Sequence, residues 1–146
     1  MLRDRSLIPL SQQHHNGLSL CVLTERSLRE DSSAANVAKL ARKAIDRYEL
    51  ELANHFEIEE SILFPAVEDH ALVPGLISEH RQLEGLIGRL REEPTTALLY
   101  EFTALLRTHI RREENELFGD IQRLVSREQL DSLGKEIDAK AVRICL

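Results

Sequence analysis

The sequence predicts an all-α fold, an up-down-up-down four-helix bundle with a short C-terminal fifth helix. Leu, Ala, Glu and Arg dominate the 146 residues, and aromatic residues make up only 4% with no Trp, which favours helices over strands. Apolar residues also recur at the i, i+3, i+4, i+7 spacing of amphipathic helices. Because 42% apolar residues are enough to bury one core, residues 1–146 are predicted to form a single domain.

A polar turn separates the first two helices. The first helix is predicted over residues 10–28, and the Asp-Ser-Ser cluster at 31–33 suits a turn and the N-cap of the next helix. The second helix is predicted over residues 34–64, where the apolar stripe is continuous. His55 and Glu59 fall on that stripe, so both side chains are expected to face the core.

Proline marks the next breaks. Pro65 should kink or end the second helix because it has no N–H for the helical ladder, and the Val-Pro-Gly sequence at 73–75 makes the following break. A third helix is predicted over residues 75–91, with His80 on its inner face. The turns after the first and third helices should lie at the end of the bundle away from the histidines.

The last two helices begin at recognisable caps. The Pro-Thr-Thr sequence at 94–96 caps a fourth helix whose inner stripe carries His109 and Glu113. A shorter fifth helix is predicted over residues 127–139, with Ser126 as its N-cap.

One motif occurs twice, in the second and fourth predicted helices. The stretches at residues 55–65 (HFEIEESILFP) and 109–119 (HIRREENELFG) share a histidine, two consecutive glutamates and a Leu-Phe pair at the same offsets. The first glutamate follows the histidine by four residues, which places both side chains on one helix face with β-carbons roughly 5–6 Å apart. Each copy can therefore offer an imidazole and a carboxylate to one ion.

Antiparallel packing would bring the inward histidines to one level of the bundle. His55, His80 and His109 would meet there, together with His14 or His15 from the first helix. Each unpaired buried polar group costs about 1–3 kcal/mol, and a buried charge more, so the pattern favours a metal site over a polar core. Imidazole and carboxylate ligands suit iron, manganese or zinc, and two carboxylates able to bridge favour a pair of ions.

The order of these motifs resembles the hemerythrin-like (HHE cation-binding) family. The resemblance rests on HFxxEE in the second helix, EHxxL at residues 79–83 in the third and HxxxEE in the fourth, and it covers nearly the whole chain. Ferritin-like di-iron bundles match less well, because they use Glu-x-x-His and no histidine here follows a glutamate by three residues. The resemblance implies a bundle around two carboxylate-bridged iron ions, and zinc or manganese would also suit the ligands.

The resemblance also implies a role for each matching residue. His55 with Glu59, and His109 with Glu113, match the ligand pairs of the second and fourth helices. The two glutamates match the carboxylates that bridge the irons. His80 matches the single ligand of the third helix.

The ligand of the first helix has two candidates. The His-x-x-apolar pattern of the third helix recurs at His15, which is followed by Leu18, whereas His14 is followed by Gly17. His15 is therefore the preferred ligand and His14 the alternative.

Two departures separate the chain from the oxygen-carrying members of this family. Those members have a second third-helix histidine one turn earlier, where this chain has Leu76. Their fourth-helix carboxylate comes five residues after its histidine, whereas Glu113 comes four after His109. The expected open position on one iron suits sensing or reaction better than reversible oxygen transport.

Three further acidic or basic positions lie near the motifs. Glu60 and Glu114, the second glutamates of each pair, are expected either to hydrogen-bond and orient a ligand imidazole or to lie on a solvated helix flank. His70 falls in the break before the third helix and is expected to be exposed.

The net charge and the cysteine content restrict the classes of partner and the cellular location that are expected. The net charge of −6 argues against a nucleic acid or an anionic membrane surface as partner. Polar residues interrupt the apolar stretch near the N-terminus, so neither a signal peptide nor a membrane span is expected, and a cytoplasmic location is the default. Cys21 and Cys145 are too few and too far apart for a disulfide framework and are expected to be free.

Three functions are compatible with the sequence. The favoured one is a non-haem di-iron protein that binds or senses oxygen, nitric oxide, or the iron and redox state, with a small diatomic molecule or peroxide as partner. The second is a di-iron enzyme that reduces peroxide or nitric oxide or oxidises a small substrate. The third is a metal-free helical interaction module whose histidines and glutamates are only polar core residues.

Overall fold

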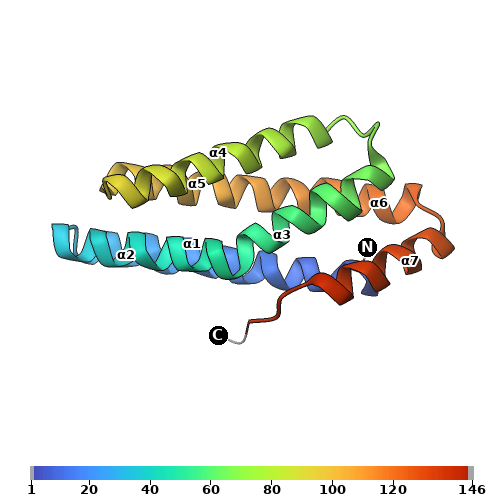
Figure 1. Cartoon of the computed structure of the whole chain (residues 1–146), viewed down its shortest axis with the longest axis horizontal. Coiled ribbons are helices and arrows are strands. Elements are labelled where there is room, and N and C mark those ends of the chain that lie inside the picture. Colours follow the sequence, from blue (N-terminus) through green and yellow to red (C-terminus); the bar gives the residue numbers. More distant parts are fainter. Residues whose placement is uncertain (1, 145–146) are drawn as a thin grey trace.

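The computed structural model describes residues 2–144, and it contains helices but no strand within that range. The prediction of an all-α fold is confirmed (Figure 1). The first helical run joins η1 (Arg5–Leu7) to α1 (Ile8–Glu30), and the third is α4 (Val73–Glu92). The last helix is α7 (Arg127–Lys140).

The second and fourth runs are built from several segments. The second run comprises α2 (Ala34–Arg47), η2 (Tyr48–Leu52), α3 (Ala53–Ile58), η3 (Glu59–Leu63) and η4 (Phe64–Val67). The fourth run comprises α5 (Thr96–Arg112), η5 (Glu113–Leu117) and α6 (Phe118–Leu124).

The helix starts follow the expected capping chemistry. The hydroxyl oxygen of each predicted cap accepts a hydrogen bond from the backbone N–H three residues later, at Ser33, Thr95 and Ser126. Such caps satisfy one of the backbone donors that every helix start leaves unpaired.

The expectation of one uniform helix over residues 34–64 is wrong in detail. The segments η2, η3 and η5 are π-helical, with a wider turn than the α-helix. The path bends between α2 and α3, as Figure 1 shows. Apolar periodicity reports which face is buried but carries little information on a single widened turn, so the sequence did not reveal these segments.

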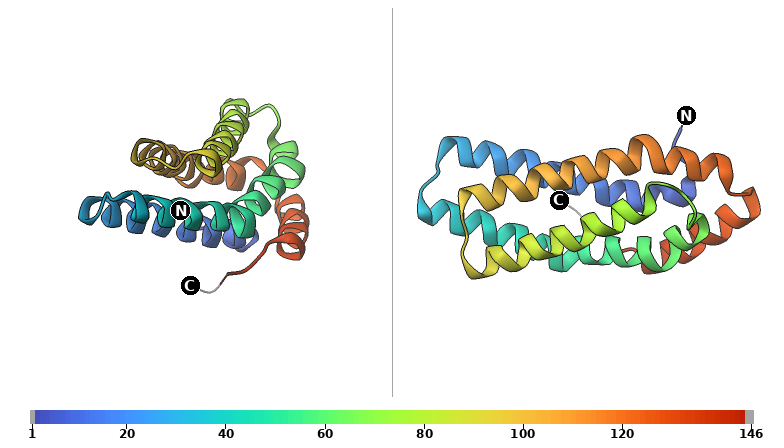
Figure 2. Two further views of the ribbon diagram at one scale, coloured as in Figure 1. Left: turned by 60° about the vertical axis from the view of Figure 1, so that its left-hand side comes forward. Right: turned by 90° about the horizontal axis from the view of Figure 1, so that it is seen from above.

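Two apolar clusters fill the interior, one on each side of a polar layer. In the first helical run, Leu20 and Cys21 belong to the first cluster, Leu7 and Leu10 belong to the second, and His14 lies between them. The other helical runs repeat this order. The turns at residues 31–33 and 93–95 lie together at the end of the bundle away from α7 (Figures 1 and 2), as predicted.

Helix α7 packs across the N-terminal end of the first run and the second run, in contact with η1, η3, α1 and α3 (Figure 2). The approach is close at Gly134, where an added β-carbon would lie 2.6 Å from Ser6 Oγ. Residues 141–144, called here the C-terminal strap, then turn back along the bundle. Val142 N–H donates to Asn54 Oδ1 at 3.0 Å and fastens the strap to α3.

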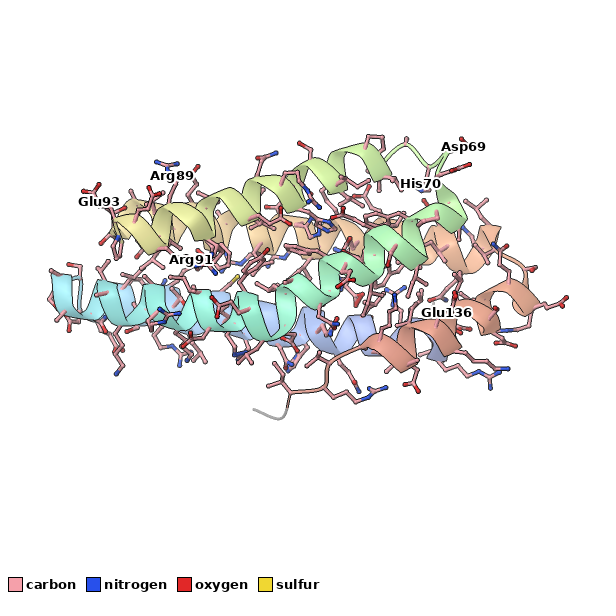
Figure 3. The ribbon with its side chains drawn as sticks, viewed as in Figure 1. Asp69, His70, Arg89, Arg91, Glu93 and Glu136 are labelled. Atoms are coloured by element: carbon pink, nitrogen blue, oxygen red, sulfur yellow. The ribbon has the colours of Figure 1, made fainter. Side chains whose placement is uncertain are left out.

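Two side chains outside the polar layer bear on the sequence-based expectations. His70, labelled in Figure 3 in the turn before α4, is partly buried rather than exposed. Its Nε2 lies 2.8 Å from Asp120 Oδ2 of α6, which holds the turn against that helix. Cys21 is a free, buried thiol whose pKa is raised by burial to about 12. Cys145 lies outside the described residues.

No helix in residues 2–144 is long and apolar enough to cross a membrane.

Candidate metal centre

Six buried side chains from four helical runs meet in the polar layer. None is more than 2% exposed, and together they form what is called here the buried cluster: His14, His55, Glu59, His80, His109 and Glu113. Glu59 and Glu113 each begin a π-helical segment, so the two copies of the duplicated motif have the same local structure. Widened turns of this kind occur frequently at functional sites.

The first-helix member of the cluster is His14, whereas the sequence pattern favours His15 as the ligand. His14 is 2% exposed and lies among the other five side chains, whereas His15 is exposed. The His-x-x-apolar pattern points to His15 because the buried residue three positions after His14 is Gly17, which that pattern does not count as apolar. An added β-carbon there would lie 2.9 Å from Ile110 Cδ1, so the Ile110 side chain occupies the space that a larger residue at position 17 would need.

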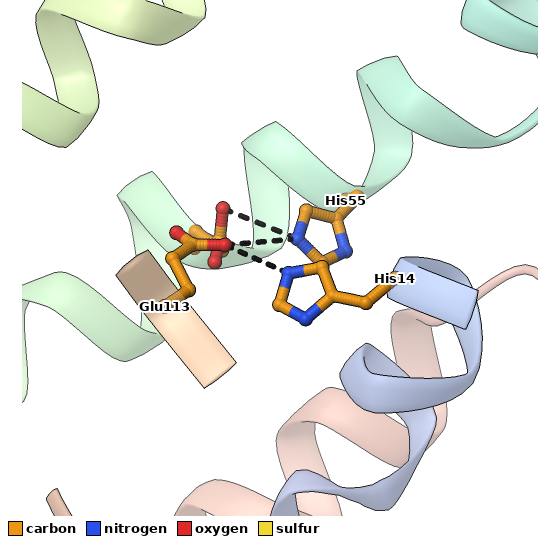
Figure 4. A group of neighbouring side chains, drawn as sticks. His14, His55 and Glu113 are labelled. Carbon is orange, nitrogen blue, oxygen red and sulfur yellow. Dashed lines mark hydrogen bonds and ion pairs between the residues drawn. The ribbon is translucent and has the colours of Figure 1, made fainter. Parts of the chain in front are cut away.

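The four imidazoles direct their Nε2 atoms at the two carboxylates. His14 Nε2 lies 2.8 Å from Glu113 Oε1, and His80 Nε2 lies 3.0 Å from Glu59 Oε1. His55 Nε2 lies between both carboxylates, 3.3 Å from Glu59 Oε1 and 3.5 Å from Glu113 Oε1. Figure 4 shows His14, His55 and Glu113 pointing toward one another. His109 is placed in the same way, with Nε2 3.4 Å from Glu113 Oε2 and 3.9 Å from Glu59 Oε1.

Several of these buried atoms lack a hydrogen-bond partner among the described residues. They are Nε2 of His55 and His109, Oε2 of Glu59 and Glu113, and Nδ1 of His14. Each such atom costs about 1–3 kcal/mol if left unpaired, which is difficult to explain in a purely structural core. A metal ion would satisfy the inward-facing ones.

The cluster divides into two overlapping sets, each with its ligand atoms within 4.8 Å of one another. The set called here the His14 position comprises His14, His55, Glu59 and Glu113. The set called the His80 position comprises His80, His109 and the same two glutamates. Each position can thus offer two imidazole nitrogens and two carboxylate oxygens to one ion, and the carboxylates are shared. The donor chemistry fits iron, manganese or zinc.

The metal-free cluster is strongly polarised. Burial lowers the pKa of His55, but the carboxylates of Glu59 and Glu113 outweigh burial and raise it to about 10. Burial likewise opposes protonation of His109, whose pKa the same carboxylates, together with Glu79, raise to about 10. The pKa of Glu59 is lowered well below its usual value, because the adjacent histidines outweigh the desolvation that would raise it. Protons therefore occupy the place of cations when metal is absent.

Each imidazole also has a partner on its outer side. His80 Nδ1 is 2.7 Å from Glu60 Oε2, and His14 Nδ1 is 3.3 Å from Glu114 Oε2. Of the two alternatives for these glutamates, a hydrogen bond to an imidazole is found for Glu60, whereas Glu114 makes only a longer contact with His14. Such outer carboxylates fix the ring orientation and raise the basicity of the inner nitrogen.

Sequence reasoning missed the other two outer partners. His109 Nδ1 is 2.9 Å from Glu79 Oε1, and His55 Nδ1 is 2.9 Å from Gln13 Oε1. The available signal was adjacency, because Gln13 and Glu79 each directly precede a cluster histidine. Consecutive side chains of a helix point about 100° apart. A residue next to an inward histidine therefore faces the neighbouring helix and can reach the histidine of that helix.

The four outer contacts form a closed ring around the bundle. Gln13 of α1 is hydrogen-bonded to the histidine of α3, Glu60 of η3 to that of α4, and Glu79 of α4 to that of α5. Glu114 of η5 completes the ring through its longer contact with the histidine of α1. Each helical run thus orients the histidine of the next, which makes the ring a property of the assembled bundle and not of any single helix.

Phenylalanine rings cover the imidazoles and limit access of water. Phe56 stacks on His80 with ring centroids 4.0 Å apart, and Phe64 stacks on the same imidazole at 5.8 Å. Phe118 stacks on His14 at 5.2 Å. Phe64 and Phe118 are the aromatic members of the duplicated Leu-Phe pairs, so this part of the motif packs against a histidine of a neighbouring helix.

The arrangement therefore combines a buried polar layer, two shared carboxylates and four oriented imidazoles. The family model of the hemerythrin HHE cation binding domain matches residues 10–121, a range that contains the whole buried cluster. No curated protein and no solved structure matches the chain.

Proposed function

The chain belongs to the hemerythrin HHE cation-binding domain family, and on that premise we propose that it is a non-haem di-iron protein. It would bind or sense oxygen, nitric oxide, peroxide, or the iron and redox state, without turnover. The proposed architecture around the site is an up-down-up-down order of the four helical runs. The observation that carries the proposal is the set of buried imidazole and carboxylate atoms that face one another without other partners.

Iron, unlike zinc, would leave open positions for a small molecule at this ligand set. Four protein ligands at each position would complete a tetrahedral zinc site, whereas iron usually takes more ligands and would retain open positions. Iron held there would supply the electron exchange that oxygen, nitric oxide and peroxide require. The contribution of the chain is to direct Nε2 of each histidine inward, to share Glu59 and Glu113 between the ions, and to exclude water through the phenylalanine rings.

The narrow access to the cluster favours a small ligand over a large substrate. A cavity of about 330 Å³ reaches Glu60 and Phe56, and another of about 540 Å³ reaches Gln13, but none of the six cluster side chains lines either one. The cluster itself is almost completely enclosed. A diatomic molecule or peroxide suits this site better than an extended organic substrate.

The test is to load the protein with ferrous iron without air, add measured portions of oxygen in the presence of a reductant, and count the oxygen consumed per chain. A binding or sensing protein should take up a near-stoichiometric amount and then stop. Continued consumption would contradict the proposal and identify a di-iron enzyme. The variant His109→Leu/Glu113→Leu is the control, because it removes one ligand pair and should not respond.

A further inference from the structure

The two copies of the duplicated motif serve the cluster in a symmetrical way. The first copy supplies Glu59, Glu60 and Phe64, and all three reach the imidazole of His80. The second copy supplies Glu113, Glu114 and Phe118, and all three reach His14. The symmetry extends to the residue that directly precedes each of those histidines, because Glu79 bonds His109 and Gln13 bonds His55.

Gln13 is where this symmetry breaks. Three of the four outer partners are carboxylates, and each is also next to an arginine, in the pairs Glu60–Arg81, Glu79–Arg112 and Glu114–Arg3. The fourth partner is a neutral amide, 3% exposed. Two imidazoles at the His80 position therefore have carboxylate partners at hydrogen-bond distance, whereas the His14 position has one amide and one longer contact.

The C-terminal strap explains why an amide is present. Asn54 Oδ1 accepts from Val142 N–H, so the atom of Asn54 that faces Gln13 is an oxygen. Gln13 Nε2 donates to that oxygen at 3.0 Å and to the carbonyl oxygen of Val142 at 3.1 Å. A carboxylate at position 13 would face two acceptors and lose both bonds.

The same contacts fix the tautomer of His55. Because the amide nitrogen of Gln13 is engaged by the strap and Asn54, Oε1 is the atom left to face the imidazole, and His55 Nδ1 must donate to it at 2.9 Å. In the neutral imidazole the lone pair is then on Nε2, which faces Glu59 and Glu113. The orientation is correct for a ligand, but a neutral acceptor polarises the ring less than a carboxylate does.

Resting on the di-iron function proposed above, we infer that Gln13 and the C-terminal strap make the two ion positions unequal, so that the His80 position fills first. The protein ligands alone do not distinguish the positions, since each has two imidazoles and the same two carboxylates. Loss of an outer carboxylate partner typically lowers metal affinity about 10–100-fold, and we expect a difference of that size between the positions.

The test is a titration of the metal-free protein with Zn²⁺, followed by nitrogen NMR of the histidine imidazoles. At one Zn²⁺ per chain, the Nε2 resonances of His80 and His109 should take the shifts of zinc-bound nitrogen, and those of His14 and His55 should take them only with the second equivalent. Zinc-bound shifts at all four together, or first at His14 and His55, would overturn the inference. Absence of any change would instead contradict the metal site itself.

Glu79→Gln supplies the matched variant, because it makes the outer partner of His109 an amide like that of His55. We expect affinity at the His80 position to fall about 10–100-fold and the order of filling to disappear. Glu116→Gln, an exposed change on the same helical run as Glu114, is the control and should keep the order. Retention of the order in Glu79→Gln, with the fold intact by circular dichroism, would contradict the role given to the outer carboxylates.

Discussion

His14 Nε2 lies 2.8 Å from Glu113 Oε1, although 99 residues separate the two in the chain. The contact joins α1 to the start of the π-helical segment η5 and places the first-helix imidazole inside the buried cluster. It also distinguishes two neighbouring histidines with opposite environments, since His15 is exposed.

This difference predicts unequal effects of removing the two histidines. His14→Ala should reduce the iron bound at the His14 position, leaving about one ion per chain in place of two. His15→Ala should retain the full content, because its side chain lies outside the cluster. Iron per chain after anaerobic loading checks both variants, and a loss confined to His15→Ala would restore the original preference.

Metal binding should stabilise the fold. Ligands that bind only the native state add about 4 kcal/mol when present at 1,000 times Kd, so added ferrous iron should raise the Tm of the wild-type chain clearly. His109→Leu/Glu113→Leu should show little response to iron, because it removes a histidine and a shared carboxylate. The double change also removes the partner of His14 and of Glu79, so its metal-free stability should fall below that of the wild type. Equal Tm values of the wild-type chain with and without iron would favour the metal-free interaction module.

The metal-free protein should lose stability as the pH rises from neutral. His55 and His109 have pKa values raised from 6.5 to about 10, so their contribution is fully present below pH 6.5 and is lost as the pH rises through about 10. The lowered pKa of Glu59 acts in the opposite direction, giving stability above pH 4.5 that is lost on acidification. Denaturant unfolding of the metal-free chain at several pH values from 6 to 10 should show the free energy of unfolding falling as the pH rises.

The iron-loaded protein should behave differently over the same interval. Protons and metal compete for the same Nε2 atoms, so metal affinity should increase with pH while the metal-free fold weakens. The gap in unfolding free energy between loaded and metal-free protein should therefore widen from pH 6 to 9. A constant gap would mean that the histidines are not ligands.

The close packing of α7 onto the N-terminus gives a prediction outside the metal site. Gly134→Ala should lower the free energy of unfolding by about 1–3 kcal/mol. The β-carbon of the alanine would lie 2.6 Å from Ser6 Oγ and 3.0 Å from Ser6 Cα. Gly88→Ala in α4 is the matched control, with nothing within 4 Å of the added carbon. It should stabilise by about 0.5–1 kcal/mol, since alanine is the better helix former. Equal effects of the two changes in urea unfolding would contradict the packing described for α7.

Much of the fold could be predicted from the sequence because periodicity and capping are local signals. The turn before α2 and the caps at Thr95 and Ser126 need only a few residues, and they are found as predicted. The π-helical turns at Glu59 and Glu113 were not predicted, because one widened turn leaves the pattern of buried residues almost unchanged. The cytoplasmic location and the absence of nucleic-acid or membrane partners remain predictions.

The candidate site could be predicted where the spacing lies within one helix. His55 with Glu59 shows this, because four residues on one helix fix two side chains on one face. Contacts between helices were harder to predict from the sequence. The choice between His14 and His15 depends on which α1 face meets α5, and the part played by Gln13 depends on a strap more than a hundred residues away.

Iron content together with the optical spectrum most directly tests the central claim of a di-iron centre in the buried cluster. The protein would be purified without added metal, loaded with ferrous iron under reducing conditions and then exposed to air. The account predicts about two irons per chain, as the two shared-carboxylate ion positions require, with new near-ultraviolet and visible absorption on oxidation. A chain that takes up no iron and shows no spectral change would contradict it and leave a helical bundle with a polar core.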